Sequence, residues 1–562
     1  MMRTPVEALL HILREEGVDR VFGNPGTTEL SLLEALSSDP RIEYVLGVQE
    51  ASVVAMADGY ARATGRTAVV SLHAAGGTAN GLVGLLNARR SRTPLVVMAG
   101  QQDRRHLVQD PMLSADLAAL ARPAVKESYE IQHGHDLPVL FRRAFAAARR
   151  APAGPVFLSI PMDLLAERTP VDVPARGDVG TPGPADPGNV RLAAALLSSA
   201  VAPAIVAGDG VGREGAVAEL VEVAEALGAT VFHQPFHDGV DFPFAHPLHA
   251  GMLGATNAAV RQALTGHDAV LIVGCHAFTP HHYTPDVPIP DGVRVVQLDS
   301  DPAEIGRNFP ATVAMVGAIR PSLAVLADGL RPDHDAARRR FDAASERATR
   351  RNAELASFAA GPASSPPGGT RLDPLAAVCA IAAALPDDAI VVEEAITSGV
   401  LLRKALRLNR PGSYVHTVGG GLGHGIGAAV GSALGAPGRP VVAVLGDGCT
   451  LFGLQGLWSA ARLGVPVTFV VMNNGEYRTL KDTLDAWHED APGRSAAYAS
   501  LDLAPPHVDF LAAAQTFGVP AVRVGSLTEL AETVAKATAA QGPLLVEVPI
   551  AGHAKAPLNP EE

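Results

Sequence analysis

The stretch Val441-Val442-Ala443-Val444-Leu445-Gly446-Asp447-Gly448 decides how this chain is interpreted, because an apolar run typical of a buried strand ends there in Gly-Asp-Gly. The next such run, 467–472, ends in Asn473-Asn474. Ligands of open parallel sheets bind where the strands end, and loop glycines let backbone amides approach phosphate closely. One carboxylate and one amide oxygen are hard ligands that suit Mg²⁺. Either half alone is more simply a turn or a helix cap, but the two together predict a metal and phosphate site.

The whole chain alternates short apolar runs with helical patterns, which is typical of parallel sheets with helices on both faces. Its 562 residues exceed what one hydrophobic core supports. The predicted fold class is α/β, with three doubly wound parallel-sheet domains at 1–168, 189–335 and 372–555 and a linker rich in Pro, Gly and Asp at 170–188. The first and third domains look alike in layout, and the middle one differs. Strands are expected at 20–22, 44–47, 67–72, 95–99, 156–160, 204–207, 230–233, 269–273, 293–298, 389–392, 441–445, 467–472 and 544–548.

The composition excludes several classes of partner. The formal net charge of −13 and the pI near 5.8 would repel nucleic-acid phosphates or an anionic membrane at long range. No stretch of about 20 apolar residues is free of charge, as a membrane-spanning helix requires, and residues 1–20 mix charges with leucines as a signal peptide does not. Cys275, Cys379 and Cys449 lie far apart, which indicates neither a disulfide framework nor a thiolate metal site. We therefore expect a soluble cytoplasmic protein with a small polar ligand.

The Gly-Asp-Gly triplet at 446–448, the βα unit after it and the Asn pair at 473–474 closely resemble the signature of enzymes that bind thiamine diphosphate. The resemblance implies that the side chains of Asp447 and Asn474 bind Mg²⁺ and that the backbone carbonyl of Glu476 is a third ligand. Cys449 stands where a serine is usual in this signature. Thiamine diphosphate and Mg²⁺ are thus the expected cofactors.

Glu50 is the candidate for the acid that activates this cofactor. The chemistry requires a carboxylic acid that hydrogen-bonds the aminopyrimidine ring nitrogen, so that the neighbouring amine can act on the thiazolium carbon. Glu50 follows the predicted strand 44–47 and opens a helix of small residues at 53–63. Taken alone, a glutamate there more simply offsets the helix dipole. The wider resemblance favours the catalytic role.

Further stretches resemble the same superfamily, and the similarity extends over essentially the whole chain. They include 23–30, 49–51, 57–62, 72–78 and 99–102 in the first domain and 419–423 in the third. The resemblance implies a pyrimidine-binding first domain, a Rossmann-like middle domain and a diphosphate-binding third domain, and within the superfamily it is greatest to benzoylformate decarboxylase. It further implies that Gly420 offers its carbonyl to the aminopyrimidine amine and that Leu422 supports the bent cofactor. The implied cofactor-binding residues are Glu50, Thr397, Ser398, Gly420, Leu422, Gly446, Asp447, Gly448, Cys449 and Asn474.

Thr27, His73 and His281 stand where benzoylformate decarboxylases have a serine and two histidines around the substrate. Histidine suits proton transfer near neutral pH, so the resemblance implies acid–base roles for both, although lone histidines are more often structural. Several positions depart from that family and make the expected pocket more polar, namely Thr27, His416, Thr479 and Thr483. The substrate class is therefore a 2-oxo acid, without a claim for benzoylformate itself. Arg478 and Lys481 either bind a second carboxylate or are solvated helix charges, and the second interpretation is favoured.

The predicted function is the non-oxidative decarboxylation of a 2-oxo acid with thiamine diphosphate and Mg²⁺. The alternative is an acetolactate synthase-like carboligase, which shares every cofactor residue and differs in joining the decarboxylated group to a second carbonyl compound. We expect a homodimer or a dimer of dimers, with each site built from two chains, because Glu50 and Asp447 are separated by a whole middle domain.

One motif favours a different function. The stretch 210–215, Gly-Val-Gly-Arg-Glu-Gly, follows a predicted strand of the middle domain and superficially fits the dinucleotide fingerprint of oxidoreductases. A lone match of this kind is weak, and inheritance of a Rossmann-like domain without a ligand explains it better. A non-catalytic scaffold is disfavoured because Glu50, Asp447 and Asn474 are all present.

Overall fold

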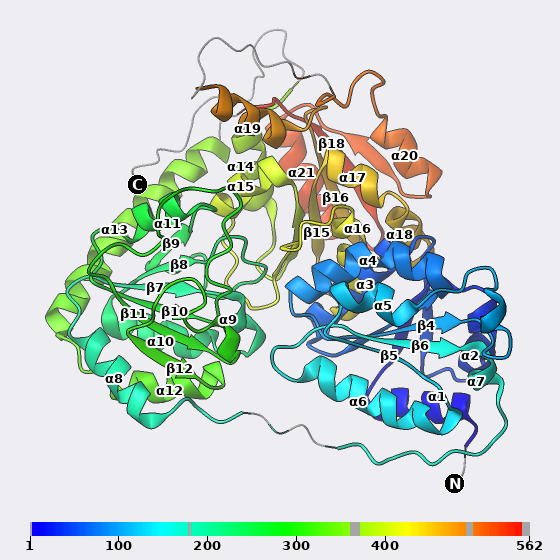
Figure 1. Ribbon diagram of the computed structural model, residues 1–562. Helices are drawn as coiled ribbons and strands as arrows, with labels where there is room; N and C mark the ends of the chain where they lie inside the picture. The colour runs from blue at the N-terminus through cyan, green and yellow to red at the C-terminus, as the bar shows by residue number, and fades with distance from the viewer. Residues whose placement is uncertain are drawn as a thin grey trace.

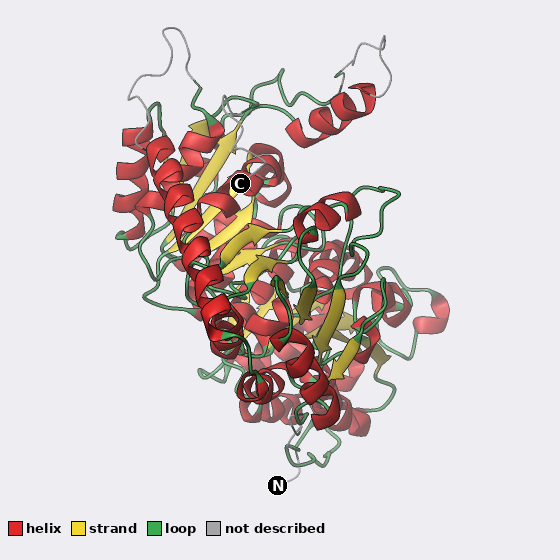
Figure 2. Ribbon diagram, turned by 90° about the vertical axis from the view of Figure 1, so that its left-hand side faces the viewer, coloured by secondary structure: helices red, strands yellow, loops and turns green. Residues whose placement is uncertain are grey.

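The computed structural model describes residues 3–177, 180, 182–359, 371–489, 498 and 500–553. Within these residues the strands form three six-stranded sheets, one in each lobe of Figure 1. Neighbouring strands of every sheet run parallel, and helices pack around the sheets (Figure 2). Successive residues of one strand, Val69 and Val70, belong to apolar clusters on opposite faces. The predicted fold class, α/β with three doubly wound parallel-sheet domains, is confirmed.

The N-terminal domain has the strand order β2-β1-β3-β4-β6-β5. Its central strands β3 and β4 are almost entirely buried, as expected of parallel strands covered on both faces. The strands are β1 (Arg20–Gly23), β2 (Glu43–Leu46), β3 (Ala68–His73), β4 (Leu95–Gln101), β5 (Glu127–Glu130) and β6 (Val156–Pro161), and the helices are α1 (Pro5–Glu15), α2 (Leu30–Ser37), α3 (Glu50–Thr64), α4 (Ala74–Arg90), α5 (Leu117–Ala121), α6 (Leu137–Arg149) and α7 (Met162–Ala166).

The middle domain has the order β12-β11-β10-β7-β8-β9, so the strand order reverses between β10 and β7 as in a Rossmann-like sheet. The strands are β7 (Pro203–Ala207), β8 (Thr230–His233), β9 (His249–Met252), β10 (Ala269–Val273), β11 (Arg294–Asp299) and β12 (Val313–Val316), and the helices are α8 (Pro187–Ser198), α9 (Asp209–Arg213), α10 (Val217–Leu227), α11 (Asn257–Leu264), α12 (Ile319–Gly329) and α13 (His334–Ala359).

The C-terminal domain has the order β14-β13-β15-β16-β18-β17. When the strands are counted from the start of each domain, the N-terminal and C-terminal sheets have the same order, 2-1-3-4-6-5. This confirms the similar layout expected for the two domains. The strands are β13 (Ile390–Glu394), β14 (Tyr414–His416), β15 (Val441–Gly446), β16 (Val467–Asn473), β17 (Ala521–Arg523) and β18 (Leu544–Pro549), and the helices are α14 (Pro374–Ala384), α15 (Ile396–Ala405), α16 (His424–Gly435), α17 (Asp447–Gly453), α18 (Gly456–Leu463), α19 (Arg478–Glu489), α20 (Phe510–Thr516) and α21 (Leu527–Thr538).

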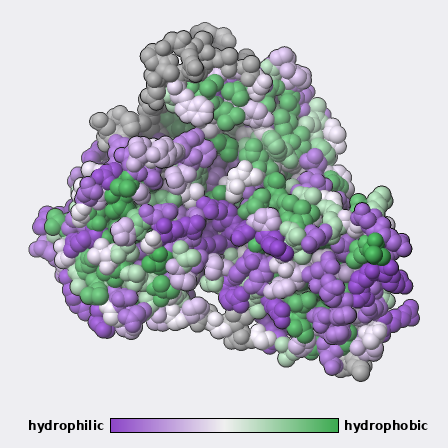
Figure 3. All heavy atoms as spheres, in the orientation of Figure 1, coloured by the Kyte–Doolittle hydropathy of each residue, from purple (hydrophilic) through white to green (hydrophobic). Residues whose placement is uncertain are grey.

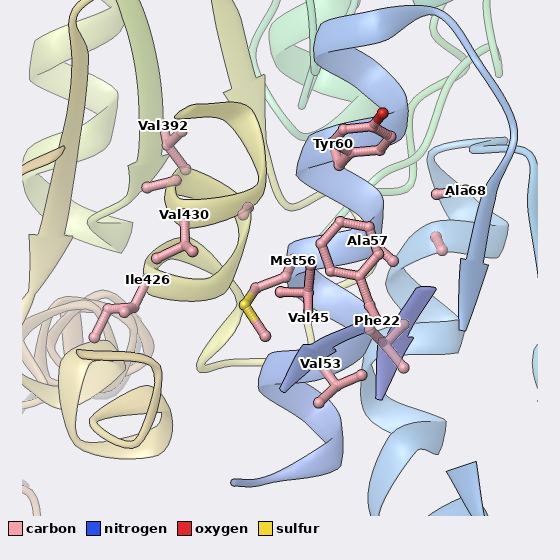
Figure 4. Packing of buried hydrophobic residues seen from close by; sticks show 14 of the residues in the cluster. Phe22, Val45, Val53, Met56, Ala57, Tyr60, Ala68, Val392, Ile426 and Val430 are labelled. Carbon is pink, nitrogen blue, oxygen red and sulfur yellow. The ribbon is translucent and has the colours of Figure 1, made fainter. Parts of the chain in front are cut away.

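The N-terminal and C-terminal domains share one hydrophobic core, in which α3 lies along α16. Figure 4 shows Met56 of α3 directed at Ile426 and Val430 of α16. The two backbones come so close that a Cβ on Gly431 would collide with the carbonyl of Met56. Glycine is therefore required there, and the helix that begins at Glu50 has a fixed position on the C-terminal domain.

Some predicted segments extend beyond the described residues. Residues 178, 179 and 181 of the predicted linker and the predicted domain ends at 1–2 and 554–555 lie outside them. Among the residues that are described, no helix combines the length and apolar character needed to cross a membrane.

Candidate active site

Asp447 lies at the carboxyl edge of the C-terminal sheet, where β15 ends and α17 begins. Its carboxylate accepts hydrogen bonds from the backbone N–H groups of Gly448 on Oδ1, at 2.8 Å, and of Gly475 on Oδ2, at 2.6 Å. The pairing of Gly446 with Met472 in the neighbouring strand β16 sets this register. The structure therefore brings the two halves of the sequence motif together.

Asn474 follows β16, and its Oδ1 accepts the backbone N–H of Glu476 at 3.0 Å. Arg371 donates to the Asn474 carbonyl at 2.7 Å, and Glu476 pairs with Asp502 in an isolated antiparallel bridge. These bonds order the loop that carries two of the three predicted metal ligands, Asn474 and Glu476. The Glu476 side chain accepts from Lys481, which leaves its backbone carbonyl as the predicted ligand atom.

The electrostatics of Asp447 fit a divalent cation. The side chain is 5% exposed, and burial raises the pKa of its carboxyl, while backbone N–H groups act in the opposite direction. Within the described part of the chain, no ion pair joins Asp447 to a cationic side chain. A metal ion bound here would supply that missing positive charge.

The expected diphosphate contacts surround the same edge. Thr397 and Ser398 lie in the first turn of α15, and a helix N-terminus favours anions. Thr397 Oγ1 lies 2.8 Å from Thr479 Oγ1. A Cβ on Gly448 would lie 2.8 Å from the Tyr477 ring, so the loop requires a glycine there. Burial raises the pKa of the Cys449 thiol well above its usual value, so Cys449 presents a neutral thiol at this site.

Glu50 opens α3 in the N-terminal domain and is 7% exposed. Its Oε1 accepts from Asn24 Nδ2 at 3.1 Å, and its Oε2 accepts from Asn80 Nδ2 at 3.0 Å. Two amide N–H donors thus orient both oxygens of the Glu50 carboxyl. The sequence motif 23–30 contained Asn24, but the pairing of either amide with Glu50 was not foreseen.

His73 ends β3 beside Glu50. A Cβ on Gly77 would lie 3.3 Å from Glu50 Oε1 and 3.4 Å from His73 Cβ, so the two side chains border the same point of α4. His73 Nδ1 lies 2.9 Å from Glu29 Oε2 and 3.0 Å from Thr28 Oγ1. A carboxylate at this distance accepts the Nδ1–H and leaves Nε2 for proton transfer.

Glu29 is the part of this site that the sequence did not reveal. It is buried, and it accepts the backbone N–H groups of Gly26 at 2.8 Å and Gly100 at 3.0 Å and the Thr28 hydroxyl at 2.6 Å. The hydroxyl beside the imidazole is thus that of Thr28, whereas Thr27, predicted to face the substrate, is exposed. The signal available was Glu29 itself, a charged residue in a motif otherwise typical of a turn.

His281 lies in the loop between β10 and β11 of the middle domain and is exposed. Its Nδ1 is 2.9 Å from His282 Nε2, and its ring packs 6.0 Å from that of Phe236. These contacts all lie within the middle domain. Among the described residues of one chain, no interaction joins His281 to His73.

The predicted loop of Gly420 and Leu422 connects β14 with α16. Gly420 has a φ of +77° and is exposed, and Leu422 is half-buried. The far end of the loop is fixed by Glu394, whose carboxyl accepts the N–H groups of His424 at 3.2 Å and Gly425 at 2.8 Å. Burial raises the pKa of Glu394 to about 7.

The favoured interpretation of Arg478 and Lys481 as solvated helix charges is wrong. Both side chains are buried. Arg478 pairs with Asp482 at 2.6 Å, and Lys481 pairs with Asp502 at 2.5 Å. His416 is also buried, and its Nδ1 lies 3.1 Å from Glu393 Oε2. Because carboxylates of the chain already neutralise Arg478 and Lys481, these two side chains are poorly suited to bind a second substrate carboxylate.

The loop that fits the dinucleotide fingerprint has its amides occupied by the protein itself. The N–H of Gly210 donates to the Gly274 carbonyl at 3.0 Å, and that of Gly212 donates to Asp241 Oδ1 at 3.2 Å. The buried carboxyls of Asp209 and Asp238 lie in the same region. A diphosphate would compete with these acceptors and meet negative charge, so the loop does not fit the oxidoreductase interpretation.

The chain has a buried acid at the start of α3 in one α/β domain and a carboxylate and amide pair at the edge of the parallel sheet in another, an arrangement that suits a cofactor with a diphosphate group. Models of thiamine pyrophosphate enzymes match the chain in three parts: the N-terminal TPP binding domain at residues 3–120, the central domain at 190–326 and the C-terminal TPP binding domain at 397–548. The chain belongs to the thiamine pyrophosphate enzyme family.

Individual relatives agree with this assignment. Benzoylformate decarboxylase of Pseudomonas aeruginosa is 37% identical over 98% of this chain and 99% of its own. Acetolactate synthase large subunit of Parasynechococcus marenigrum is 29% identical over 96% of this chain and 86% of its own. Among solved structures, the Rhodococcus jostii RHA1 thiamine diphosphate-dependent 4-hydroxybenzoylformate decarboxylase has a TM-score of 0.85 and 32% identity, covering 98% of this chain and 99% of its own. Benzoylformate decarboxylase from Polynucleobacter necessarius has a TM-score of 0.87 and 30% identity, covering 99% and 100%.

These comparisons confirm the predicted family and the prediction of a thiamine diphosphate-dependent enzyme of the carboxy-lyase class. The individual site residues, the metal and the assembly remain predictions.

Proposed function

We propose that this chain catalyses the non-oxidative decarboxylation of a 2-oxo acid with thiamine diphosphate and Mg²⁺. The observation that carries the proposal is the placement of Glu50 and His73 beside the same residue of α4, Gly77, with Glu50 held by two amides and His73 by Glu29. The pair supplies an acid for the cofactor and an imidazole for proton delivery. The named activities of the relatives from Pseudomonas aeruginosa and Rhodococcus jostii support the same reaction class.

In this proposal each residue has a defined task. When bound, thiamine diphosphate accepts the electron pair released as the bond to the carboxylate breaks. Glu50 holds a proton at the pyrimidine nitrogen, and the Gly420 carbonyl orients the pyrimidine amine. His73 carries a proton on Nε2 for the carbon that has lost CO₂, because Glu29 keeps Nδ1–H engaged. Proton delivery gives an aldehyde product.

The metal would be bound by the side chains of Asp447 and Asn474 and the carbonyl of Glu476. This metal site is supported by the carboxylate of Asp447, which is buried and has no cationic partner among the described residues. The loop order around 473–476 supports the same assignment. Mg²⁺ is the proposed ion because all three ligand atoms are oxygens.

We also propose that each site is shared between two copies of the chain, in a homodimer or a dimer of dimers. Large apolar side chains are exposed beside both half-sites: Val83 and Leu86 on α4 are 41% and 46% exposed, and Phe452 on α17 is 56% exposed. Figure 3 shows apolar surface running from the C-terminal domain to the N-terminal domain on this side. Such patches are typical of surfaces that a partner covers.

The test is product analysis with a panel of 2-oxo acids, thiamine diphosphate and Mg²⁺. Mass spectrometry should show an aldehyde one carboxyl group smaller than its substrate. A ligated product formed instead would favour the acetolactate synthase-like alternative. Absence of turnover with every acid that related decarboxylases accept would contradict the proposed function.

The expected cytoplasmic location remains a prediction.

A further inference from the structure

One amide side chain holds the loop between β14 and α16 against the N-terminal domain. Asn87 lies near the end of α4 and is 1% exposed. Its Oδ1 accepts the Gly421 N–H at 3.0 Å, and its Nδ2 donates to the Gly421 carbonyl at 2.8 Å. Because both partners are backbone groups of known polarity, the orientation of the amide is fixed. Asn87 therefore clamps the peptide groups on both sides of Gly421.

This clamp determines where the Gly420 carbonyl points. The Gly420 carbonyl and the Gly421 N–H belong to one planar trans peptide group and point in opposite directions. Since the N–H points at Asn87, the carbonyl points away from it. A peptide that donates a hydrogen bond through its N–H also becomes a stronger acceptor at its carbonyl. Asn87 thus sets both the direction and the acceptor strength of the Gly420 carbonyl.

The glycines of the loop fit this arrangement. A Cβ on Gly419 would collide with Asn87, and a Cβ on Gly421 would lie 2.8 Å from Val83 Cγ1. A Cβ on Gly420 would meet no atom within 4 Å, but its φ of +77° is one that other residues rarely adopt. The outer two glycines are needed for contact with α4, and the middle one is needed for its backbone conformation.

We propose that Asn87 is a positioning residue for activation of the cofactor. The inference rests on the proposed function, in which the Gly420 carbonyl accepts a hydrogen bond from the aminopyrimidine amine. Asn87 acts through the Gly420–Gly421 peptide and is itself bonded to the protein backbone. Asn80, which bonds Glu50, lies seven residues earlier on the same helix, about two turns away. Helix α4 therefore contacts both kinds of protein group that are proposed to address a pyrimidine, Glu50 and the Gly420 loop.

The test compares Asn87→Ala with a matched control, Ser432→Ala. Ser432 is buried in α16, and its hydroxyl lies 3.5 Å from the carbonyl of Gly59, so the control removes a polar contact across the same domain interface but far from the loop. In the protein without cofactor, hydrogen exchange of the peptide that contains Gly421 should be roughly tenfold faster in Asn87→Ala. Without Asn87 the Gly421 N–H loses its hydrogen-bond partner, so the loop opens more often. The control should leave that exchange unchanged.

The decisive measurement is proton exchange at the thiazolium carbon of bound thiamine diphosphate, made at saturating cofactor. We expect exchange about tenfold or more slower in Asn87→Ala, with calorimetry showing weaker cofactor binding, and wild-type values for Ser432→Ala. A wild-type exchange rate in Asn87→Ala would overturn the positioning role even if the melting temperature falls. Failure of the wild-type protein to bind thiamine diphosphate would overturn the proposed function, and this inference with it.

Asn87→Asp provides a second test that does not depend on the folding of Asn87→Ala. Its carboxylate can still accept the Gly421 N–H, but it cannot donate to the Gly421 carbonyl. The thiazolium exchange rate should lie between those of the wild type and Asn87→Ala, or below the wild type if Asn87→Ala does not fold. A rate equal to that of the wild type would count against the clamp.

Discussion

The buried carboxylate of Asp58, which lies beside His424, leads to a prediction about the free energy of unfolding. Asp58 lies in α3, and its Oδ2 is 3.1 Å from Nε2 of His424 at the start of α16. Arg62 Nη1 lies 3.5 Å from the same oxygen. Burial alone would raise the pKa of Asp58, but the adjacent imidazole of His424 and the charge of Arg62 outweigh it, and the pKa is lowered from 3.8 to about 2.

A carboxyl whose pKa is lowered in the folded state stabilises that state above its unfolded pKa and loses this contribution as the pH falls through the folded value. For Asp58 the contribution is therefore present at pH 7, amounts to about 2 kcal/mol, and disappears between about pH 4 and pH 2. Asp58→Asn keeps the shape but removes the charge. We expect it to lower the free energy of unfolding at pH 7 by about 2 kcal/mol.

The assay is urea denaturation of the protein without cofactor at pH 7, followed by circular dichroism. Glu532→Gln is the control. Glu532 pairs with Lys536 on the surface, and an exposed pair of this kind contributes at most about half a kcal/mol to the free energy of unfolding. A double-mutant cycle of Asp58→Asn with His424→Gln should give a coupling energy of about 1 kcal/mol or more. Equal denaturation midpoints for the wild type and Asp58→Asn would refute the reasoning.

Three further predictions concern the proposed site. Asp447→Ala should abolish activity and metal-dependent cofactor binding, because it removes the charged ligand; unchanged thiamine diphosphate affinity by calorimetry would contradict the metal site. Glu50→Gln should still bind the cofactor but exchange its thiazolium proton about a hundredfold or more slowly, as expected when a general acid is lost; a wild-type rate would mean that another carboxyl does this work. Chains carrying Glu50→Gln, refolded together with chains carrying Asp447→Ala, should regain some activity, because a mixed dimer contains one intact shared site. Mixed dimers without activity would argue for sites within single chains.

All the central strands could be predicted from the sequence, whereas the edge strands could not, with the single exception of β2. All the expected strands occur within a residue or two of their predicted positions, whereas β5, β9, β12, β14 and β17 were not predicted. Each of these five lies at an edge of its sheet. A central parallel strand is covered on both faces and appears as a continuous apolar run. An edge strand such as β5, Glu-Ser-Tyr-Glu, is half-buried throughout and gives no such signal.

The candidate site divides in the same way. Asp447 and Asn474 were identified because a glycine-rich turn after an apolar strand is a local pattern. Glu29 and Asn87 were not, because their roles come from contacts with residues 44 and 334 positions away. The burial of Lys481 was also unforeseen, since a charged helix position gives no sign that Asp502, 21 residues further along the chain, will neutralise it. Local patterns are therefore visible in the sequence, whereas support from residues distant along the chain is not.

The length of α4 has a consequence for how the proposed dimer responds to its ligands. One face of this helix contacts Glu50 through Asn80 and the Gly420 loop through Asn87, both in the same chain. If Glu50 serves the cofactor on the partner while the Gly420 loop serves the cofactor on its own chain, α4 is a rigid connection between two cofactors. A displacement of α4 on binding at one site would then be transmitted to the other site.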